Sequence, residues 1–148
     1  AVVDLSHANT KGNCSFFDKS QHEYNLRRRI VTDEKGYYRA RSIAPSGYGC
    51  SPDGPTQEVL DMLGRHRQRP AHIHFFISAP GHRQLSTQIN VAGDKYLWDE
   101  FAYATSDGQV GDIRFIDDAE SAQARGLQGP YTEVDFDFQM QNAPVAPK

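Results

Sequence analysis

The chain has 148 residues, which is enough for one domain with a hydrophobic core and too few for two. Its formal net charge is -3, with acidic and basic residues interspersed, so neither nucleic acid nor an anionic membrane is an expected partner. No apolar run approaches a transmembrane helix and no signal peptide is recognisable, so we expect a soluble, cytoplasmic protein whose Cys14 and Cys50 stay reduced.

Three strands are expected in the first third of the chain. Residues 1–5 resemble the end of a strand, and the lack of an initiator methionine or of an earlier partner strand indicates a piece of a longer protein. Residues 25–32 and 37–43 predict the two strands of a hairpin, because Asp33-Glu34-Lys35-Gly36 between them suits a tight turn.

Two helical segments are expected. Residues 55–64 have apolar side chains at helical spacing, with Pro55 at the start and Gly64 able to close the helix in the left-handed conformation. Residues 118–125 predict a further helical turn.

The second half of the chain predicts four more strands, which are a run ending at Ser78 and residues 85–91, 112–116 and 132–140. The last segment alternates acidic and apolar residues, so one of its faces is expected to be buried and the other wet. Many short strands with turn signals predict an all-β fold, a β-sandwich of mostly antiparallel strands with a short helix and long loops over residues 1–140. Residues 141–148 predict a flexible tail.

Two histidines stand two positions apart in the apolar, strand-forming run from Arg69 to Ile77. Because alternate side chains of a strand share a face, His72 and His74 would point the same way. Neutral imidazole is a ligand for iron, copper, zinc and nickel, and a rigid strand holds two ligands well. The pattern therefore indicates a metal site, although it also fits two hydrogen-bonded or half-exposed histidines.

Tyr48 is flanked by Gly47 and Gly49 just after a predicted strand. Glycines on both sides let the backbone turn sharply and present the phenol to a cleft. A phenolate is a hard anionic oxygen that favours a hard, highly charged ion such as Fe(III). Alone, Tyr48 fits an ordinary loop aromatic; together with the histidine pair it is a candidate ligand.

Motifs spread along the chain resemble the intradiol ring-cleaving dioxygenases. They are His7 to Asn13, Ser15 to Asp18, Pro45 to Cys50, Leu63 to His66, Arg69 to Phe76 and Gly93 to Trp98. In that family a β-sandwich carries a non-haem Fe(III) held by two tyrosines and two histidines. A preceding helical segment forms the homodimer and part of the pocket, and we expect this chain to lack that segment.

The resemblance implies that catechol is cleaved with O2 to cis,cis-muconate, in the breakdown of aromatic compounds. Tyr48, His72 and His74 match three iron ligands, and the family's tyrosine at the position of Tyr48 also takes up a substrate proton. Residues 51–68 resemble the members that act on catechol more than those that act on protocatechuate.

Four more residues match positions around the iron. Arg69 matches a residue whose charge stabilises a carbanion-like form of the ring. Gln88 matches a polar residue beside the iron, and Phe101 and Ala102 match positions that line the ring pocket. On the residues alone, Arg69 also fits a surface ion pair, Gln88 a polar strand position and Phe101 plain core.

Two residues depart from the family pattern. Cys14 stands where the family has its other tyrosine ligand, and Ser6 stands where it has tryptophan. A thiolate can bind iron, but the cysteine side chain is shorter than tyrosine by several ångströms, so we expect Cys14 not to replace it. These departures leave a second hypothesis open, a catalytically silent β-sandwich that binds zinc or no metal and serves as a binding or assembly module.

Overall fold

The computed structural model describes residues 1–144. Within these residues the chain forms mostly strands, with two α-helices and a single 3-10 turn. In chain order they are β1 (Val2–His7), β2 (Arg27–Val31), β3 (Tyr48–Gly49), α1 (Pro55–Met62), β4 (Gln68–Arg69), β5 (His72–Ser78), β6 (Leu85–Val91), η1 (Asp107–Gln109), β7 (Val110–Ile116), α2 (Ala119–Ala124) and β8 (Tyr131–Asp135). Neither helix is long and apolar enough to cross a membrane.

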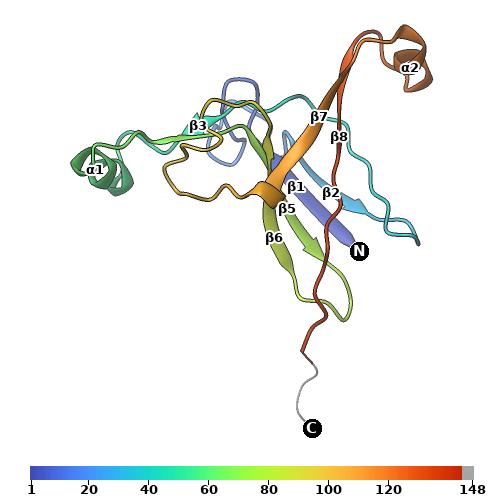
Figure 1. Cartoon of the computed structure of the whole chain (residues 1–148), viewed down its shortest axis with the longest axis horizontal. Coiled ribbons are helices and arrows are strands. Elements are labelled where there is room, and N and C mark those ends of the chain that lie inside the picture. The colour runs from blue at the N-terminus through green and yellow to red at the C-terminus, as the bar shows by residue number, and fades with distance from the viewer. Residues whose placement is uncertain (145–148) are drawn as a thin grey trace.

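Six of the strands form one sheet in the order β2-β1-β5-β6-β7-β8. All neighbours are antiparallel except β6 and β7, which pair in parallel. The sheet is curled, and β7 and β8 extend from it to α2, while α1 lies at another extremity of the molecule (Figure 1). The short strands β3 and β4 pair with each other in a separate sheet. The prediction of an all-β fold with mostly antiparallel strands is confirmed.

The core lies against one face of β1, β5 and β6. Its buried residues are Val3, Leu5, Phe75, Ile77 and Ile89. They stand at alternate positions of their strands, and Leu5 and Val3 are paired with Phe75 and Ile77 across β1 and β5. Because period-2 alternation sends the residues between them to the opposite face, that face is free to carry polar groups.

Most of the predicted elements are present. Helix α1 begins at Pro55, and Gly64 just beyond it has a φ of 64°. Helix α2 is capped by Asp118, whose carboxylate accepts a hydrogen bond from the Ser121 N–H at 2.6 Å. The predicted β5 and β6 are confirmed, and β6 has the predicted bounds.

The predicted hairpin of residues 25–32 and 37–43 is wrong in its second half. The turn forms, because the Asp33 carboxylate accepts hydrogen bonds from the N–H groups of Lys35 and Tyr37, but residues 37–43 form no strand. The partner of β2 is β1. Tyr38 instead packs its ring against Phe75 and donates a hydrogen bond to the Phe136 carbonyl at 2.8 Å, so tertiary packing decides the path of this segment.

The predicted strand over residues 132–140 ends early, since β8 stops at Asp135. Within β8 the expected alternation is reversed: Val134 is 38% exposed, whereas Glu133 is half-buried and forms ion pairs with Arg114 and Arg125. Beyond β8 the alternation holds, and three apolar side chains pack against the core, namely Phe136, Phe138 and Met140.

Part of the expected tail is paired with the turn between β5 and β6. Arg83 donates its backbone N–H to the Gln141 carbonyl at 2.8 Å, and Ala143 donates its N–H to the Gly81 carbonyl at 2.8 Å. Residues 141–143 therefore lie against residues 81–83. Residues 145–148 of the predicted tail lie outside the described residues.

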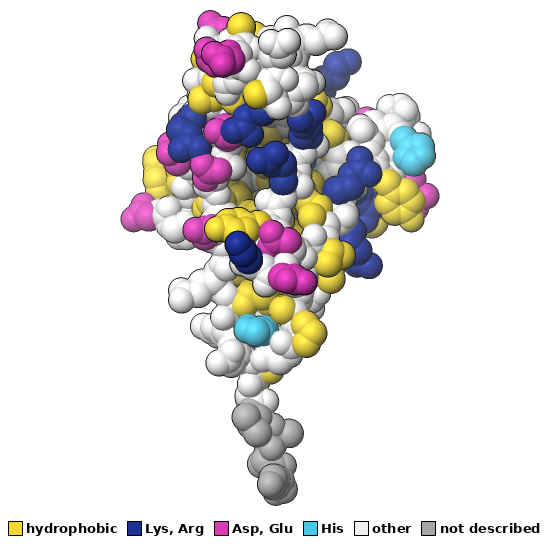
Figure 2. Space-filling model, turned by 90° about the vertical axis from the view of Figure 1, so that its right-hand side faces the viewer, with side chains coloured by type: hydrophobic (Ala, Val, Ile, Leu, Met, Phe, Trp, Pro, Cys, Tyr) yellow, Lys and Arg dark blue, Asp and Glu magenta, His cyan; other side chains and the backbone are white. Residues whose placement is uncertain are grey.

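Acidic, basic and hydrophobic side chains are interspersed over the face of the molecule in Figure 2. On this face of the described residues, charges of one sign do not gather into a broad block. This agrees with the mixed charge pattern along the sequence.

Candidate metal centre

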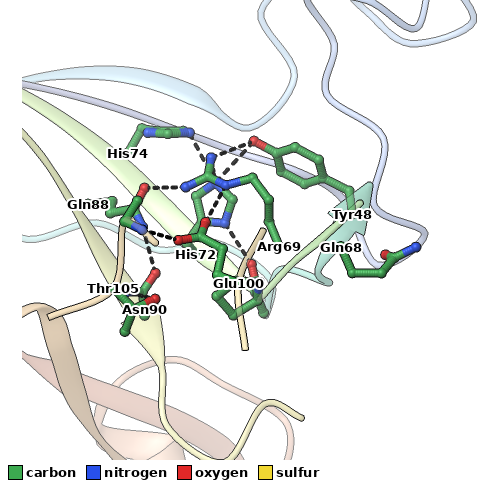
Figure 3. A network of polar contacts seen from close by, with 12 residues as sticks. Tyr48, Gln68, Arg69, His72, His74, Gln88, Asn90, Glu100 and Thr105 are labelled. Atoms are coloured by element: carbon green, nitrogen blue, oxygen red, sulfur yellow. Dashed lines mark hydrogen bonds and ion pairs between the residues drawn. The ribbon is translucent and has the colours of Figure 1, made fainter. Parts of the chain in front are cut away.

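Three side chains from two strands converge at one point (Figure 3). His72 and His74 project from β5 on the face opposite the core, and their Nε2 atoms are 3.1 Å apart. Tyr48, from β3, places its Oη 3.0 Å from the His72 Nε2. The prediction that both histidines share one face is confirmed, and Tyr48 joins them although it lies 24 residues earlier in the chain.

The His72 ring is oriented by the backbone. Its Nδ1 lies 2.7 Å from the Pro70 carbonyl oxygen, which can only accept a hydrogen bond, so Nδ1 carries the proton. The lone pair of Nε2 then faces Tyr48 and His74. This is the usual second contact of a metal-binding histidine, in which one ring nitrogen is fixed by hydrogen bonding so that the other is free to bind.

Both histidines are neutral at neutral pH. Burial lowers the pKa of His72 to about 3, and the nearby positive charge of Arg69 acts in the same direction. Burial also lowers the pKa of His74, again with the help of Arg69. Histidine binds a metal only in its neutral form, so these environments favour ligation.

The two spacings around the His72 Nε2 fit ligand atoms that share a metal ion. A metal with ligand distances of about 2.0–2.1 Å and right-angled bonds has neighbouring ligand atoms about 3.0 Å apart. The spacings of 3.0 Å and 3.1 Å around the His72 Nε2 match this value. Within residues 1–144, no three His, Cys, Asp or Glu side chains are grouped so that they could hold a metal, so Cys14 does not join the two histidines.

Close backbone packing places Tyr48 in the site. Tyr48 is paired with Arg69 across β3 and β4. A Cβ on Gly47 would lie 2.5 Å from the Arg69 carbonyl oxygen, and one on Gly12 would lie 2.7 Å from the Gly47 carbonyl oxygen. Gly47 is thus needed for a close approach of two backbones. The loop that carries Cys14 also packs against the backbone next to Tyr48, and both Cys14 and Cys50 are free thiols.

The Arg69 guanidinium lies beside the three candidate ligands (Figure 3). Its Nη1 is 3.1 Å from the His72 Nε2 and 3.4 Å from the Tyr48 Oη. Its Nη2 donates a hydrogen bond to the Gln88 Oε1 at 2.8 Å. Arg69 and Gln88 are therefore brought together at the candidate centre, and Arg69 is not a surface residue, since its side chain is 15% exposed.

The guanidinium has a buried counter-charge that the sequence analysis missed. Glu100 has a side chain only 1% exposed and accepts a hydrogen bond from the Arg69 Nε at 2.5 Å. Its neighbours Phe101 and Ala102 are half-buried and exposed, respectively. Phe101 donates its N–H to the Gln68 carbonyl at 3.4 Å, which places this loop next to β4. Glu100 carries no sequence signal, because an acid near an aromatic residue is more often on a surface.

The all-β fold brings a tyrosine and two histidines together beside an arginine, an arrangement that suits a metal-dependent oxygenase. The dioxygenase family profile (Dioxygenase_C) matches residues 1–142. The chain therefore belongs to this dioxygenase family.

Among curated proteins, the chain is 55% identical over 142 residues to the catechol 1,2-dioxygenase of Acinetobacter baylyi, a match that covers 95% of this chain and 46% of that protein. Among solved structures, it resembles the catechol 1,2-dioxygenase of Pseudomonas arvilla C-1, with 66% identity and a TM-score of 0.91 over 98% of this chain and 47% of that one. The 3-chlorocatechol 1,2-dioxygenase of Rhodococcus opacus 1CP gives a TM-score of 0.85 at 28% identity, covering 96% and 53% of the two chains.

The chain thus spans about half the length of the curated relatives that it matches. The structural likeness confirms the predicted β-sandwich, because these relatives have the same fold over nearly the whole of this chain. The family resemblance inferred from the sequence motifs is confirmed as well.

Proposed function

We propose that the protein cleaves the ring of catechol between its two hydroxyl-bearing carbons with O2 and forms cis,cis-muconate. Both atoms of O2 enter the product, so no further reductant is needed. The observation that carries this proposal is the convergence of the Tyr48 Oη and the Nε2 atoms of His72 and His74 beside the Arg69 guanidinium. The similarity to catechol 1,2-dioxygenases over 95% of the chain supports it.

In this proposal Tyr48, His72 and His74 hold a non-haem Fe(III). When bound, a ferric ion would supply the Lewis-acid and redox chemistry that makes an electron-rich catechol ring reactive toward O2. A phenolate oxygen and neutral imidazoles suit such an ion, and burial keeps the imidazoles neutral.

Tyr48 has a second task as the base. Its Oη would take up a proton from a catechol hydroxyl, which requires the phenolate form. The Arg69 Nη1 lies 3.4 Å from this oxygen, on the side where the proton would be transferred.

Arg69 would act on the ring, and Gln88 would act on Arg69. The fixed guanidinium charge stabilises negative charge that develops on the ring carbons as they react. Gln88 keeps the guanidinium in place through its Oε1. Phe101 and Ala102 would line the ring pocket.

For the whole protein we infer a homodimer that is located in the cytoplasm.

A second candidate function is a catalytically silent domain that holds zinc through the same three side chains, or holds no metal. One observation favours it: Cys14, at the position of the family's other tyrosine ligand, is not grouped with His72 and His74. Three protein ligands and a water suit zinc well. The partly buried Arg69 favours the first function, because a zinc site has no need for a cation beside it.

One experiment separates the two. Purified protein is assayed for iron and zinc, its visible spectrum is recorded, and catechol is added under air with muconate and O2 uptake measured. Iron near one per chain, a tyrosinate-to-iron absorption band and muconate formation are expected. Tyr48→Phe should lose the band, whereas Tyr37→Phe, at a tyrosine that is 72% exposed, should keep it. Zinc or no metal, with no muconate, would establish the silent domain.

A further inference from the structure

A single buried carboxylate joins the Arg69 guanidinium to the loop of residues 100–105. The Glu100 Oε1 accepts from the Arg69 Nε at 2.5 Å, and its Oε2 accepts from the Ala104 N–H at 2.7 Å. The Glu100 backbone carbonyl accepts a hydrogen bond from the Arg65 Nη2 at 3.2 Å. Both carboxylate oxygens are therefore used, one toward the arginine and one toward the loop itself.

The same loop reaches the other side of the guanidinium through a chain of amides. Gln88, which accepts from the Arg69 Nη2, donates its Nε2 to the Asn90 Oδ1 at 2.8 Å. Asn90 is fully buried and donates its Nδ2 to the Thr105 Oγ1 at 3.3 Å. Figure 3 shows these side chains in sequence from Arg69 to Thr105.

These contacts direct the third nitrogen of the Arg69 guanidinium, Nη1, toward the candidate ligands. The Nε and Nη2 groups of Arg69 are bound by Glu100 and Gln88, and Nη1 points at Tyr48 and His72. A guanidinium is planar, so fixing two of its nitrogens fixes the direction of the third. Glu100 holds the Nε end, where its charge makes the hydrogen bond stronger than that of the neutral Gln88.

We propose that Glu100 is a positioning residue that holds the Arg69 guanidinium toward the Tyr48 oxygen and couples it to the loop of residues 100–105. This inference rests on the proposed function and deepens it. Glu100 touches neither the candidate ligands nor the substrate in this scheme. It acts by keeping the cation of Arg69 directed at the reacting ring, where a shift of about 1 Å is enough to lower a rate by about a hundredfold.

The first test is kinetic. Glu100→Gln keeps the shape, but its one amide oxygen can accept from only one of the Arg69 Nε–H and the Ala104 N–H, and the charge that attracts the guanidinium is gone, so the hold on the guanidinium is weakened. Expected results are a kcat lower by about 100-fold, a KM for catechol changed by less than about threefold, and retention of iron and of the visible band. Glu100→Asp, which keeps the charge, should recover at least about tenfold of that loss. Glu120→Gln, at an exposed acid of α2, is the matched control and should behave as wild type.

A double-mutant cycle shows whether Glu100 acts through Arg69. In an Arg69→Gln background, Glu100→Gln should lower kcat by less than about twofold further, because the group that it positions is gone. Equal losses in the two backgrounds would overturn the proposal. So would a folded Glu100→Gln protein with the kcat of wild type, or, if that variant does not fold, a folded Glu100→Asp protein with a kcat as low as that of Arg69→Gln, because the charge is kept there.

The second test needs no activity. In metal-free protein labelled with ¹⁵N, the Arg69 Nε–H should give a slowly exchanging resonance, identified by its loss in Arg69→Lys. The resonance should persist in Glu120→Gln and disappear in Glu100→Gln. If catechol is not turned over by the wild type but the resonance behaves in this way, the proposed function fails and the positioning of Arg69 by Glu100 stands. A resonance that survives Glu100→Gln would refute the positioning role.

Discussion

The two faces of strands β5 and β6 are built on different principles. One face carries Phe75 and Ile89, which pack with other apolar side chains in the core. The opposite face carries His72, His74 and Gln88, each of which has a specific polar contact. Apolar packing is non-directional and sums over area, whereas a buried polar group depends on a particular partner.

The difference separates stability from function along a single strand. A core side chain can be replaced by another of similar volume with modest cost, because its contacts are not directional. On the polar face, removal of one group leaves its neighbours without partners, as with Arg69 and Glu100. Changes on the core face should therefore alter folding, and changes on the polar face should alter metal binding and catalysis.

The largest expected effect lies on the core face. Phe75→Ala removes a ring that is 5% exposed and should lower the free energy of unfolding by about 3–5 kcal/mol, measured by urea denaturation. Phe76→Ala, at the next position but 45% exposed, is the control and should cost less than about 1 kcal/mol. Iron bound per folded molecule should not change in either variant. Similar losses from both would contradict the division into two faces.

The next effect is the pH dependence of stability on the polar face. The pKa of His72 is lowered by burial from its usual 6.5 to about 3, so the unfolded chain takes up a proton first as the pH falls. The contribution of neutral His72 to the free energy of unfolding is then fully present above pH 6.5 and is lost as the pH falls from 6.5 to 3. Each histidine that stays neutral in the folded state contributes a slope of up to about 1.4 kcal/mol per pH unit.

Two other histidines act in the same direction, since burial also lowers the pKa of His7 and of His74. Urea denaturation of metal-free protein between pH 7 and pH 4.5 measures the combined slope. His72→Asn should flatten it. A stability that is constant over this range would mean that His72 can be protonated in the folded protein.

A smaller effect on stability, with a large one on metal binding, is expected for His74. His74→Asn should change the free energy of unfolding of the metal-free protein by less than about 1 kcal/mol, because the imidazole is half-buried and lies near the positive charge of Arg69. Its iron affinity should fall by more than about 100-fold, measured by competition with a chelator. The control is His82→Asn, at an exposed turn. Unchanged affinity in His74→Asn would remove His74 from the proposed ligand set.

The smallest effect is expected for an exposed ion pair at the edge of the sheet. Arg29 and Asp4 form a hydrogen-bonded pair at 2.7 Å between β2 and β1, with side chains 73% and 35% exposed. Water and salt screen such a pair. Arg29→Ala should leave the urea midpoint unchanged within error. A clear fall in the urea midpoint would show that this exposed pair stabilises the fold, and it would remove the expected difference from the Arg69–Glu100 pair.

The sequence by itself determined what depends on local periodicity. Alternation along residues 72–78 placed His72 and His74 on one face, and the spacing and end residues of 55–64 defined α1. The family motifs around Tyr48 and the histidines were sufficient to assign the dioxygenase family. These features are readable because each follows from residues within a few positions of one another.

Only the tertiary structure decided which distant segments meet. It gave β2 the partner β1 in place of residues 37–43, and it ended β8 at Asp135. It also brought Glu100 to Arg69, 31 residues away, and buried the Glu100 carboxylate. Such pairings depend on the total area buried and on long-range contacts of the whole chain, and no pattern within a short window encodes them.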